Sequence, residues 1–125
     1  MKKAVILFIT VITAAACTSV KNAGSIDLDT SDSTVYEITI IDNQFDNWYL
    51  MNFSPAGDRS NEYYRSMNNL AVSNWNQYYN SGRYKRVIDS YIDYWPTVDY
   101  GMEVNRKLYW YFKYIEESSG IRLSQ

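Results

Sequence analysis

The longest periodic stretch of the chain is residues 99–121, where apolar residues recur at helical spacing. At roughly 100° per residue, one arc collects the following positions: Gly101, Val104, Leu108, Tyr111, Phe112 and Ile115. Asp99 can cap the start, and Gly120 fits the left-handed position after the last turn. The pattern predicts a long C-terminal amphipathic helix whose apolar face the rest of the domain packs against.

Residues 35–52 carry two shorter patterns. Tyr36, Ile38 and Ile40 alternate with more polar positions over 35–41, and this period of two predicts a strand with one buried face. Asp42 can then cap a short helix with one apolar stripe formed by Phe45, Trp48, Tyr49 and either Met51 or Asn52. The segment Ser54-Pro55-Ala56-Gly57 predicts a turn.

A second helix is predicted from about Ser60 to Tyr79. Its apolar arc contains Tyr64, Met67, Ala71, Trp75, Tyr78 and Tyr79. Asn68 falls inside that arc, and a buried amide needs hydrogen-bond partners because an unpaired one costs about 1–3 kcal/mol. We therefore interpret Asn68 as a satisfied core amide in preference to a ligand-binding group.

Residues 87–95 fit two structures. Ile88, Ser90, Ile92 and Tyr94 alternate with their neighbours, which favours a strand, whereas Ile88 and Ile92 also have helical spacing. If residues 87–95 form a strand, the order of elements is strand, helix, helix, strand, helix. The predicted fold class is therefore α+β, with a small two-stranded sheet packed against the long C-terminal helix. Two strands alone are marginally stable, so the helices would have to hold them.

The N-terminus has the pattern of a secretory signal peptide. Lys2 and Lys3 precede an apolar run, and Ala14-Ala15-Ala16 leads into Cys17, the only cysteine. This junction resembles the lipobox of bacterial lipoproteins, although Ala14 stands where leucine is commonest. We predict a lipoprotein signal peptide at 1–16 with Cys17 as the lipidated residue; ordinary cleavage with a spare thiol is the alternative.

Three parts are predicted: the signal peptide at 1–16, a lipidated cysteine and flexible tether at 17–34, and one tyrosine-rich globular domain at 35–125. The chain holds 13 tyrosines, 4 tryptophans and 4 phenylalanines, which can build a core in a domain of this size. Without Lys2 and Lys3 the net charge is −4, which argues against a nucleic-acid partner.

The usual catalytic and metal-binding side chains are scarce. Histidine is absent, and an acylated Cys17 leaves no thiol nucleophile, so serine triads and zinc sites of ordinary composition are excluded. Five scattered glycines make no phosphate loop. We expect no enzyme activity, no catalytic residue, no cofactor and no metal.

Carboxylates are the remaining catalytic candidates. Asp89, Asp93, Asp99 and Glu103 could bind calcium or act as an acid–base pair. A structural interpretation is favoured instead: Asp99 as a helix cap, Glu103 paired with Lys107, and both other aspartates on the solvent side of the predicted strand.

Surface aromatics are the candidate binding residues. Trp110 falls on the polar face of the long helix, with Tyr114 one turn later and Arg106 and Lys113 beside them. Such a group suits a sugar, a peptide or a protein partner. The alternative is that the first helix or the chain termini cover Trp110, which would make it ordinary core.

The C-terminal run resembles a known group of proteins. Its residues are Tyr100-Gly101, Glu103-Val104-Asn105, Lys107-Leu108-Tyr109 and Tyr111-Phe112-Lys113-Tyr114. This run is similar to the signature of short Bacteroidota lipoproteins that share a domain without an assigned function. The resemblance supplies no catalytic residue and no ligand.

The resemblance also implies a location. In such bacteria an acidic run after the lipidated cysteine marks surface lipoproteins, and Thr18-Ser19-Val20-Lys21 lacks one. We therefore expect the periplasmic face of the outer membrane, with the cell surface as the alternative. Asp32-Ser33-Thr34 resembles the O-glycosylation site of these organisms.

These patterns lead to one functional expectation and one rival. We expect a membrane-anchored cell-envelope lipoprotein that works as a binding or structural module, with an envelope protein or glycan as partner. The rival is a glycan- or peptidoglycan-acting enzyme or binding protein that uses carboxylates and surface aromatics.

Overall fold

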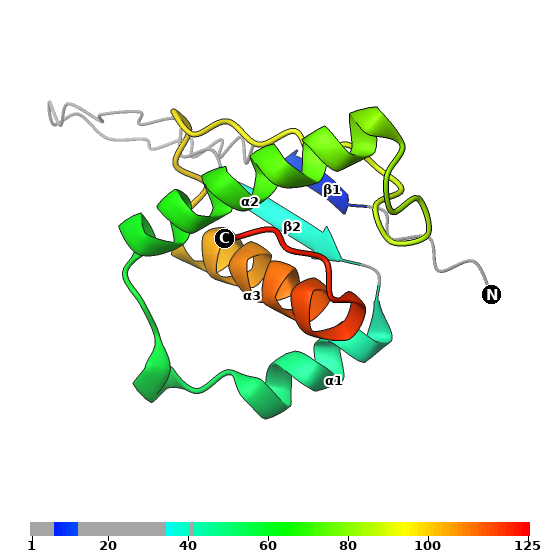
Figure 1. Cartoon of the computed structure of the whole chain (residues 1–125). Coiled ribbons are helices and arrows are strands. Elements are labelled where there is room, and N and C mark those ends of the chain that lie inside the picture. Colours follow the sequence, from blue (N-terminus) through cyan, green and yellow to red (C-terminus); the bar gives the residue numbers. More distant parts are fainter. Residues whose placement is uncertain (1–6, 13–34, 41) are drawn as a thin grey trace, which may run out of the picture.

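The computed structural model describes residues 7–12, 35–40 and 42–125. Most of the described chain is helical, and its elements run as follows (Figure 1): β1 (Leu7–Ile12), β2 (Val35–Ile40), α1 (Asn43–Asn52), the 3₁₀ turn η1 (Pro55–Gly57), α2 (Asn61–Ser81) and α3 (Met102–Ser119). The predicted tether, Cys17 and Asp32-Ser33-Thr34 lie outside the described residues.

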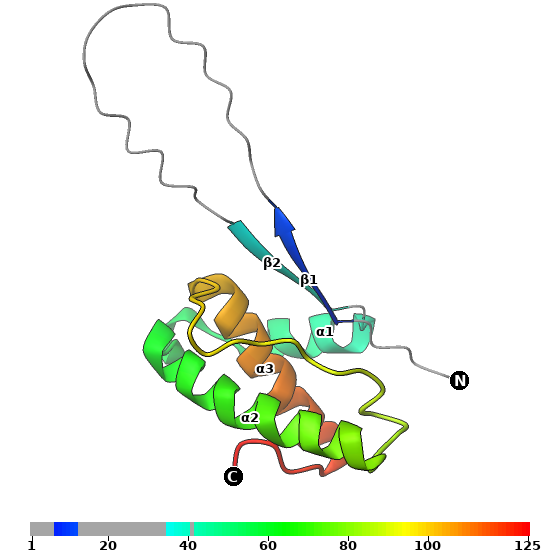
Figure 2. The same ribbon diagram turned by 90° about the horizontal axis from the view of Figure 1, so that it is seen from above.

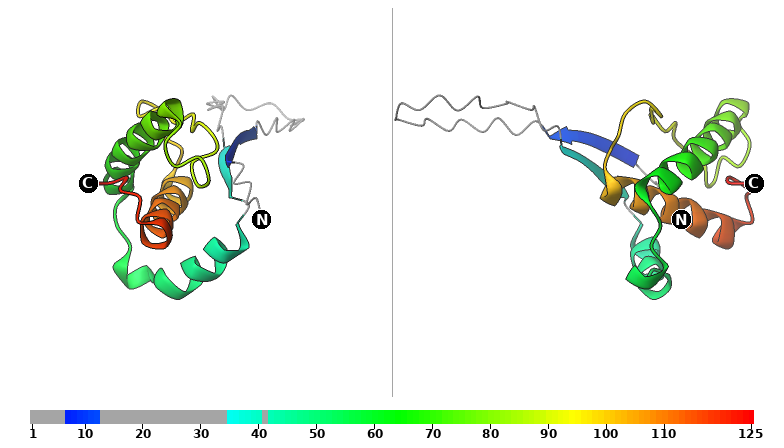
Figure 3. Two further views of the ribbon diagram at one scale, coloured as in Figure 1. Left: turned by 45° about the vertical axis from the view of Figure 1, so that its right-hand side comes forward. Right: turned by 90° about the vertical axis from the view of Figure 1, so that its left-hand side faces the viewer.

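Helix α3 is the central element of the fold. Helices α1 and α2 pack on it from different sides, and β2 also contacts it (Figures 1 and 3). The apolar arc predicted from the sequence is buried there, since Val104, Leu108, Tyr111, Phe112 and Ile115 are all in the core. The prediction of a long amphipathic helix is confirmed.

Both ends of α3 depend on glycine. Gly120 ends the helix in the left-handed region at φ 74°, as predicted, and Ile121 returns to the core. The residue before the first turn is Gly101, at φ 90°, and not Asp99. Asp99 instead accepts hydrogen bonds from the Gly101 N–H and from the Asn61 amide group.

Helices α1 and α2 begin and end close to the predicted positions. Asp42 caps α1 by accepting from the N–H groups of Gln44 and Phe45, and Ser60 caps α2 by accepting from the Tyr63 N–H. Gly82 ends α2 in the left-handed region. The buried face of α2 is formed by Tyr64, Asn68, Ala71, Val72 and Trp75. Tyr79, which the predicted apolar arc included, is instead 41% exposed, whereas Val72, which it left out, is buried.

The prediction of a second strand over 87–95 is wrong. Ile88, Ile92 and Tyr94 are buried and the residues between them are not, but their backbone forms no ladder. Side chains of α2 bond this backbone instead: Trp75 Nε1 donates to the Ser90 carbonyl at 2.7 Å, and Asn76 bonds both the N–H and the carbonyl of Ile92 at 2.8 and 2.9 Å. The alternating pattern therefore reflected burial and not a strand.

The predicted α+β class is overturned with it. The folded body is three helices and a C-terminal tail, with β2 packed against α3, and in the described chain no sheet joins residues 35–40 to 87–95. A strand is present at Val35–Ile40, but it pairs antiparallel with β1 (Figure 2). In this pairing Ile38 lies opposite Ile9. Strand β1 falls inside the predicted signal peptide and, of the described elements, contacts β2 alone.

The C-terminal tail completes the core. Leu123 is fully buried, and the tail carbonyls of Arg122 and Leu123 accept hydrogen bonds from Tyr78 and Asn74 of α2. Among the described helices, none is both long and apolar enough to cross a membrane.

Candidate functional site

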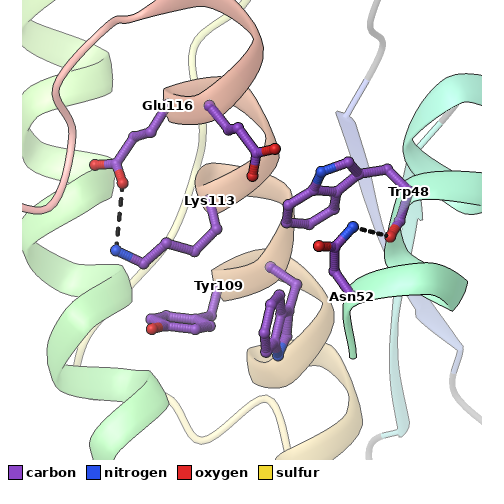
Figure 4. A pocket seen from close by; sticks show the side chains of 7 residues that line it. Trp48, Asn52, Tyr109, Lys113 and Glu116 are labelled. Carbon is purple, nitrogen blue, oxygen red and sulfur yellow. Dashed lines mark hydrogen bonds and ion pairs between the residues drawn. The ribbon is translucent and has the colours of Figure 1, made fainter. Parts of the chain in front are cut away.

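An open hollow lies between α1 and α3 on the outer face of the long helix. Two of its lining residues come from α1 and five from α3 (Figure 4): Trp48, Asn52, Tyr109, Trp110, Lys113, Glu116 and Glu117. Residues spaced three and four apart share a helix face, which brings Tyr109, Lys113 and Glu116 to one wall. This is the polar face on which the sequence placed Trp110.

Helix α1 covers much of Trp110. The indole ring packs against Trp48, Tyr49 and Phe53, with ring centroids 6.0, 6.3 and 5.8 Å away. Its Nε1 is buried without a hydrogen-bond partner. Trp110 is half-buried, so it belongs to the α1–α3 contact and also to the wall of the hollow.

Lys113 and Glu116 are bound to the C-terminal tail as well as lining the hollow. Glu116 Oε1 accepts from the N–H groups of Leu123 and Ser124 at 2.9 and 2.7 Å, and from the Ser124 hydroxyl at 2.8 Å. Lys113 Nζ donates to Glu116 Oε2 at 3.3 Å and to the Ser124 hydroxyl at 3.0 Å. Both side chains are thereby held in place.

This network keeps Glu116 ionised. Burial acts to raise the pKa of its carboxyl, but the hydrogen bonds from Ser124 and Leu123 and the charge of Lys113 outweigh burial and leave the pKa below its usual value. Glu117, at the rim, is exposed. The hollow therefore offers one carboxylate held by hydrogen bonds beside an ammonium group, and a second carboxylate that is exposed to solvent.

Arg106 lies outside this hollow and is already paired. Its Nε and one terminal nitrogen donate to the two oxygens of Asp58 at 3.1 and 2.6 Å, and Tyr64 donates its hydroxyl to the same carboxylate at 2.5 Å. The hydrogen bonds from Arg106 hold the pKa of Asp58 below its usual value. The pair joins the segment after η1 to α3.

Tyr114 faces another part of the molecule. Its ring is buried against Phe45 and Trp48, with centroids 5.7 and 5.6 Å apart. It lines a second depression together with other residues: Asp42, Gln44, Arg86, Val87, Ile115, Ser118 and Ser119. Of the four candidate binding residues, Trp110 and Lys113 thus share a hollow, whereas Arg106 and Tyr114 lie elsewhere.

The carboxylates considered for catalysis do not line the hollow. Asp89, Asp93 and Glu103 are exposed, and Asp99 bonds Asn61 and lies 3.9 Å from Arg65. Within the described part of the chain, no group of three carboxylate or cysteine side chains could hold a metal ion.

Two buried asparagines, Asn68 of α2 and Asn105 of α3, lie where these helices meet, and the sequence predicted burial only for Asn68. Asn68 donates its amide to the Asn105 carbonyl at 2.8 Å, which satisfies its nitrogen, whereas its own Oδ1 has no partner. Asn105 is fully buried as well, and its side chain bonds Asn61 and Tyr94. Its place next to Val104 on the apolar arc of α3 was the signal that could have identified it.

Trp95 is an exposed aromatic residue that the sequence analysis did not include among the candidate binding residues. It lies in the irregular segment before Pro96 and is 60% exposed, far more than Trp110. Tyr91, in the same segment, is 54% exposed and meets Tyr79 of α2 edge-on. A tryptophan just before a proline in a loop was the available signal.

Comparison with known proteins assigns the chain to a family. Residues 2–125 match the model of a family of unknown function, DUF6146. The chain belongs to this family. This confirms one part of the resemblance, namely that the chain contains a shared domain without an assigned function. No curated protein and no solved structure matches the chain significantly.

Family membership brings no ligand or activity to the residues of this site. What the site can do follows from its side chains: the aromatic rings offer apolar contact, the amide of Asn52 and the two glutamates offer polar contacts, and Lys113 offers a positive charge. Such a surface can bind a polar ligand that also has apolar faces.

Proposed function

We propose that this protein is a lipid-anchored binding protein of the bacterial cell envelope, and that the hollow between α1 and α3 binds a glycan. The anchor is supported by the sequence: a basic start, an apolar run, and three alanines before the single cysteine at position 17. The binding function is supported by the geometry of the hollow.

The hollow has the mixed chemistry that a sugar needs. The C–H faces of a sugar ring pack on aromatic side chains, here Trp48, Tyr109 and Trp110, while its hydroxyls donate to carboxylates and exchange hydrogen bonds with amides. The observation that carries the proposal is the meeting of two tryptophans, whose centroids are 6.0 Å apart, with two carboxylates in one open hollow.

Binding is favoured over hydrolysis of the glycan. A glycosidase needs a general acid whose pKa is raised so that it carries a proton at neutral pH. Glu116 has a lowered pKa because its hydrogen bonds stabilise the charged form. Glu117 is exposed to water.

The test measures glycan retention by three variants of α1 and α3. We expect purified protein to co-sediment with peptidoglycan or to bind envelope polysaccharides on a glycan array, and Trp48→Ala to weaken this retention about tenfold. Glu117→Ala should also weaken it without touching the core. Met51→Ala is the matched control, because Met51 is 85% exposed on α1 and does not line the hollow.

The result that would overturn the proposal is equal retention by all variants, or no retention of any glycan. Retention of a protein partner alone, sensitive to Trp48→Ala, would replace the glycan by a protein ligand. Circular dichroism melting of each variant separates lost binding from lost folding.

A further inference from the structure

Strand β1 covers one edge of β2 and is otherwise separate from the folded body. The two strands pair antiparallel over their full length, from Leu7 opposite Ile40 to Ile12 opposite Val35. Figure 2 shows the two strands side by side. In the described chain, β1 contacts no helix, whereas β2 contacts α3. Ile38 and Ile40 of β2 are buried in the core. β2 therefore belongs to the domain, and β1 is attached to it through a strand edge alone.

Removal of residues 1–16, which the proposed function includes, takes β1 away. The edge of β2 is then left with unpaired backbone N–H and C=O groups next to a buried apolar row. Such an edge is a template for another strand, and proteins cover it when it is not blunted by proline, a bulge or charge. No proline interrupts Val35–Ile40.

We propose that in the processed protein this edge pairs with β2 of a second copy, antiparallel about a two-fold axis at Ile38. This inference rests on the proposed export and processing, but not on glycan binding. The second copy would take the place that β1 occupies in the structure.

The sequence of β2 suits pairing with itself. In the β1 pairing, the apolar residues Leu7, Ile9 and Val11 lie opposite Ile40, Ile38 and Tyr36. A second β2 in antiparallel register, centred on Ile38, places Tyr36, Ile38 and Ile40 at those same three positions. Because strand side chains alternate with a period of two, this register keeps the apolar rows of both strands on one face of the sheet.

The one charged residue of β2, Glu37, is also compatible with pairing between two copies. In this register Glu37 lies opposite Thr39 of the second copy, so like charges do not face each other across the strands. A lipid anchor would add to the effect, because it confines the copies to one membrane and so raises their effective concentration. A two-fold dimer is the commonest closed assembly and leaves no free edge at this interface.

The test uses the full chain, expressed in a bacterium with its own leader and extracted from membranes in detergent. Native mass spectrometry reports the mass of each chain and the number of chains in a particle. We expect chains that begin at an acylated Cys17, in particles of two. Thr39→Lys and Thr39→Glu form a matched pair, since each change occurs twice in the dimer and places a charge opposite Glu37.

Thr39→Lys should tighten the dimer and Thr39→Glu should weaken it, each by about 3- to 10-fold in the dissociation constant. Their melting temperatures as dilute monomers control for effects on the fold. Processed chains that stay monomeric, or variants that do not differ, would overturn the dimer and leave the anchor intact. Chains that retain residues 1–16 would overturn processing and the free edge together.

Discussion

At the scale of single residues, polar groups within an aromatic core decide how this domain is held together. The buried side chain of Asn105 donates to Asn61 and accepts from the Tyr94 hydroxyl at 3.0 Å. Burial raises the pKa of Tyr94 to about 12, so its hydroxyl stays protonated and keeps donating. The ion pair of Asp58 and Arg106 has a similar role nearer the surface, and it makes stability depend on pH.

Asp58→Asn should make the free energy of unfolding depend less on pH in the acidic range. The folded pKa of Asp58 lies below its usual value of 3.8 because Arg106 and Tyr64 bond the charged form. The pair therefore stabilises the fold above pH 3.8, and that stability is lost as the pH falls through the lower, folded pKa. We expect Asp58→Asn to lower the free energy of unfolding at pH 7 by about 1 kcal/mol.

Urea denaturation from pH 2 to pH 7 measures this effect. Asp93→Asn is the control, because Asp93 is exposed in an irregular segment. An unchanged difference between wild type and Asp58→Asn across the whole range would show that the Asp58 ion pair does not stabilise the fold.

At the scale of elements, the three helices followed their sequence patterns and the segment 87–95 did not. Local features define a helix: apolar spacing of 3.6, a capping side chain and a terminal glycine, all present in α2 with Ser60 and Gly82. An extended segment needs partners for its backbone from elsewhere. For 87–95 those partners are the side chains of Trp75 and Asn76, which no alternation of residues 87–95 could reveal.

Asn76→Ala should loosen this segment without disturbing α2. The amide of Asn76 bonds both backbone groups of Ile92, and its loss leaves them unpaired next to the core, at a cost of about 1–3 kcal/mol. Gln77→Ala, its exposed neighbour on the same helix, is the control. Thermal melting reports the cost, and amide hydrogen exchange should quicken around Ile92 in Asn76→Ala. Protection equal to that of wild type would mean that side chains of α2 are not what orders residues 87–95.

At the scale of the whole molecule, the described chain divides into a helical body and a strand that touches the body only through β2. The body is closed by its own tail, because Leu123 is buried and Glu116 binds the backbone of the last residues. Strand β1, by contrast, contacts no described helix. If residues 1–16 are removed, as we propose, α1, α2 and α3 lose no contact with β1.

Cys17→Ser should release the protein from the membrane. If Cys17 carries the lipid, its replacement removes the acylation site, while the folded body, which lacks a described helix able to cross a membrane, is unaffected. When the cells are fractionated, the variant should then be found in a soluble fraction and no longer with the membrane. Ser19→Ala, two residues away, is the control and should stay in the membrane. A Cys17→Ser protein that remains with the membrane would refute the anchor.

The candidate site could be predicted only in part. The sequence placed Trp110 and Lys113 on the outer face of the long helix, and both line the hollow. It could not indicate that Arg106 forms an ion pair with Asp58, 48 residues away in the chain, or that Tyr114 is buried beside Phe45. Those facts depend on contacts between distant segments, which helix periodicity does not encode.

By itself, the sequence determined the helices and most of their apolar faces, because caps, glycines and helical periodicity act within a few residues. Only the tertiary structure decided that 87–95 packs without a ladder, that α1 covers much of Trp110, and that β2 pairs with β1. The physical reason is the same in each case. Alternation and amphipathicity show which side of a segment is buried, whereas the identity of the covering element is set by the competition among all segments for one core.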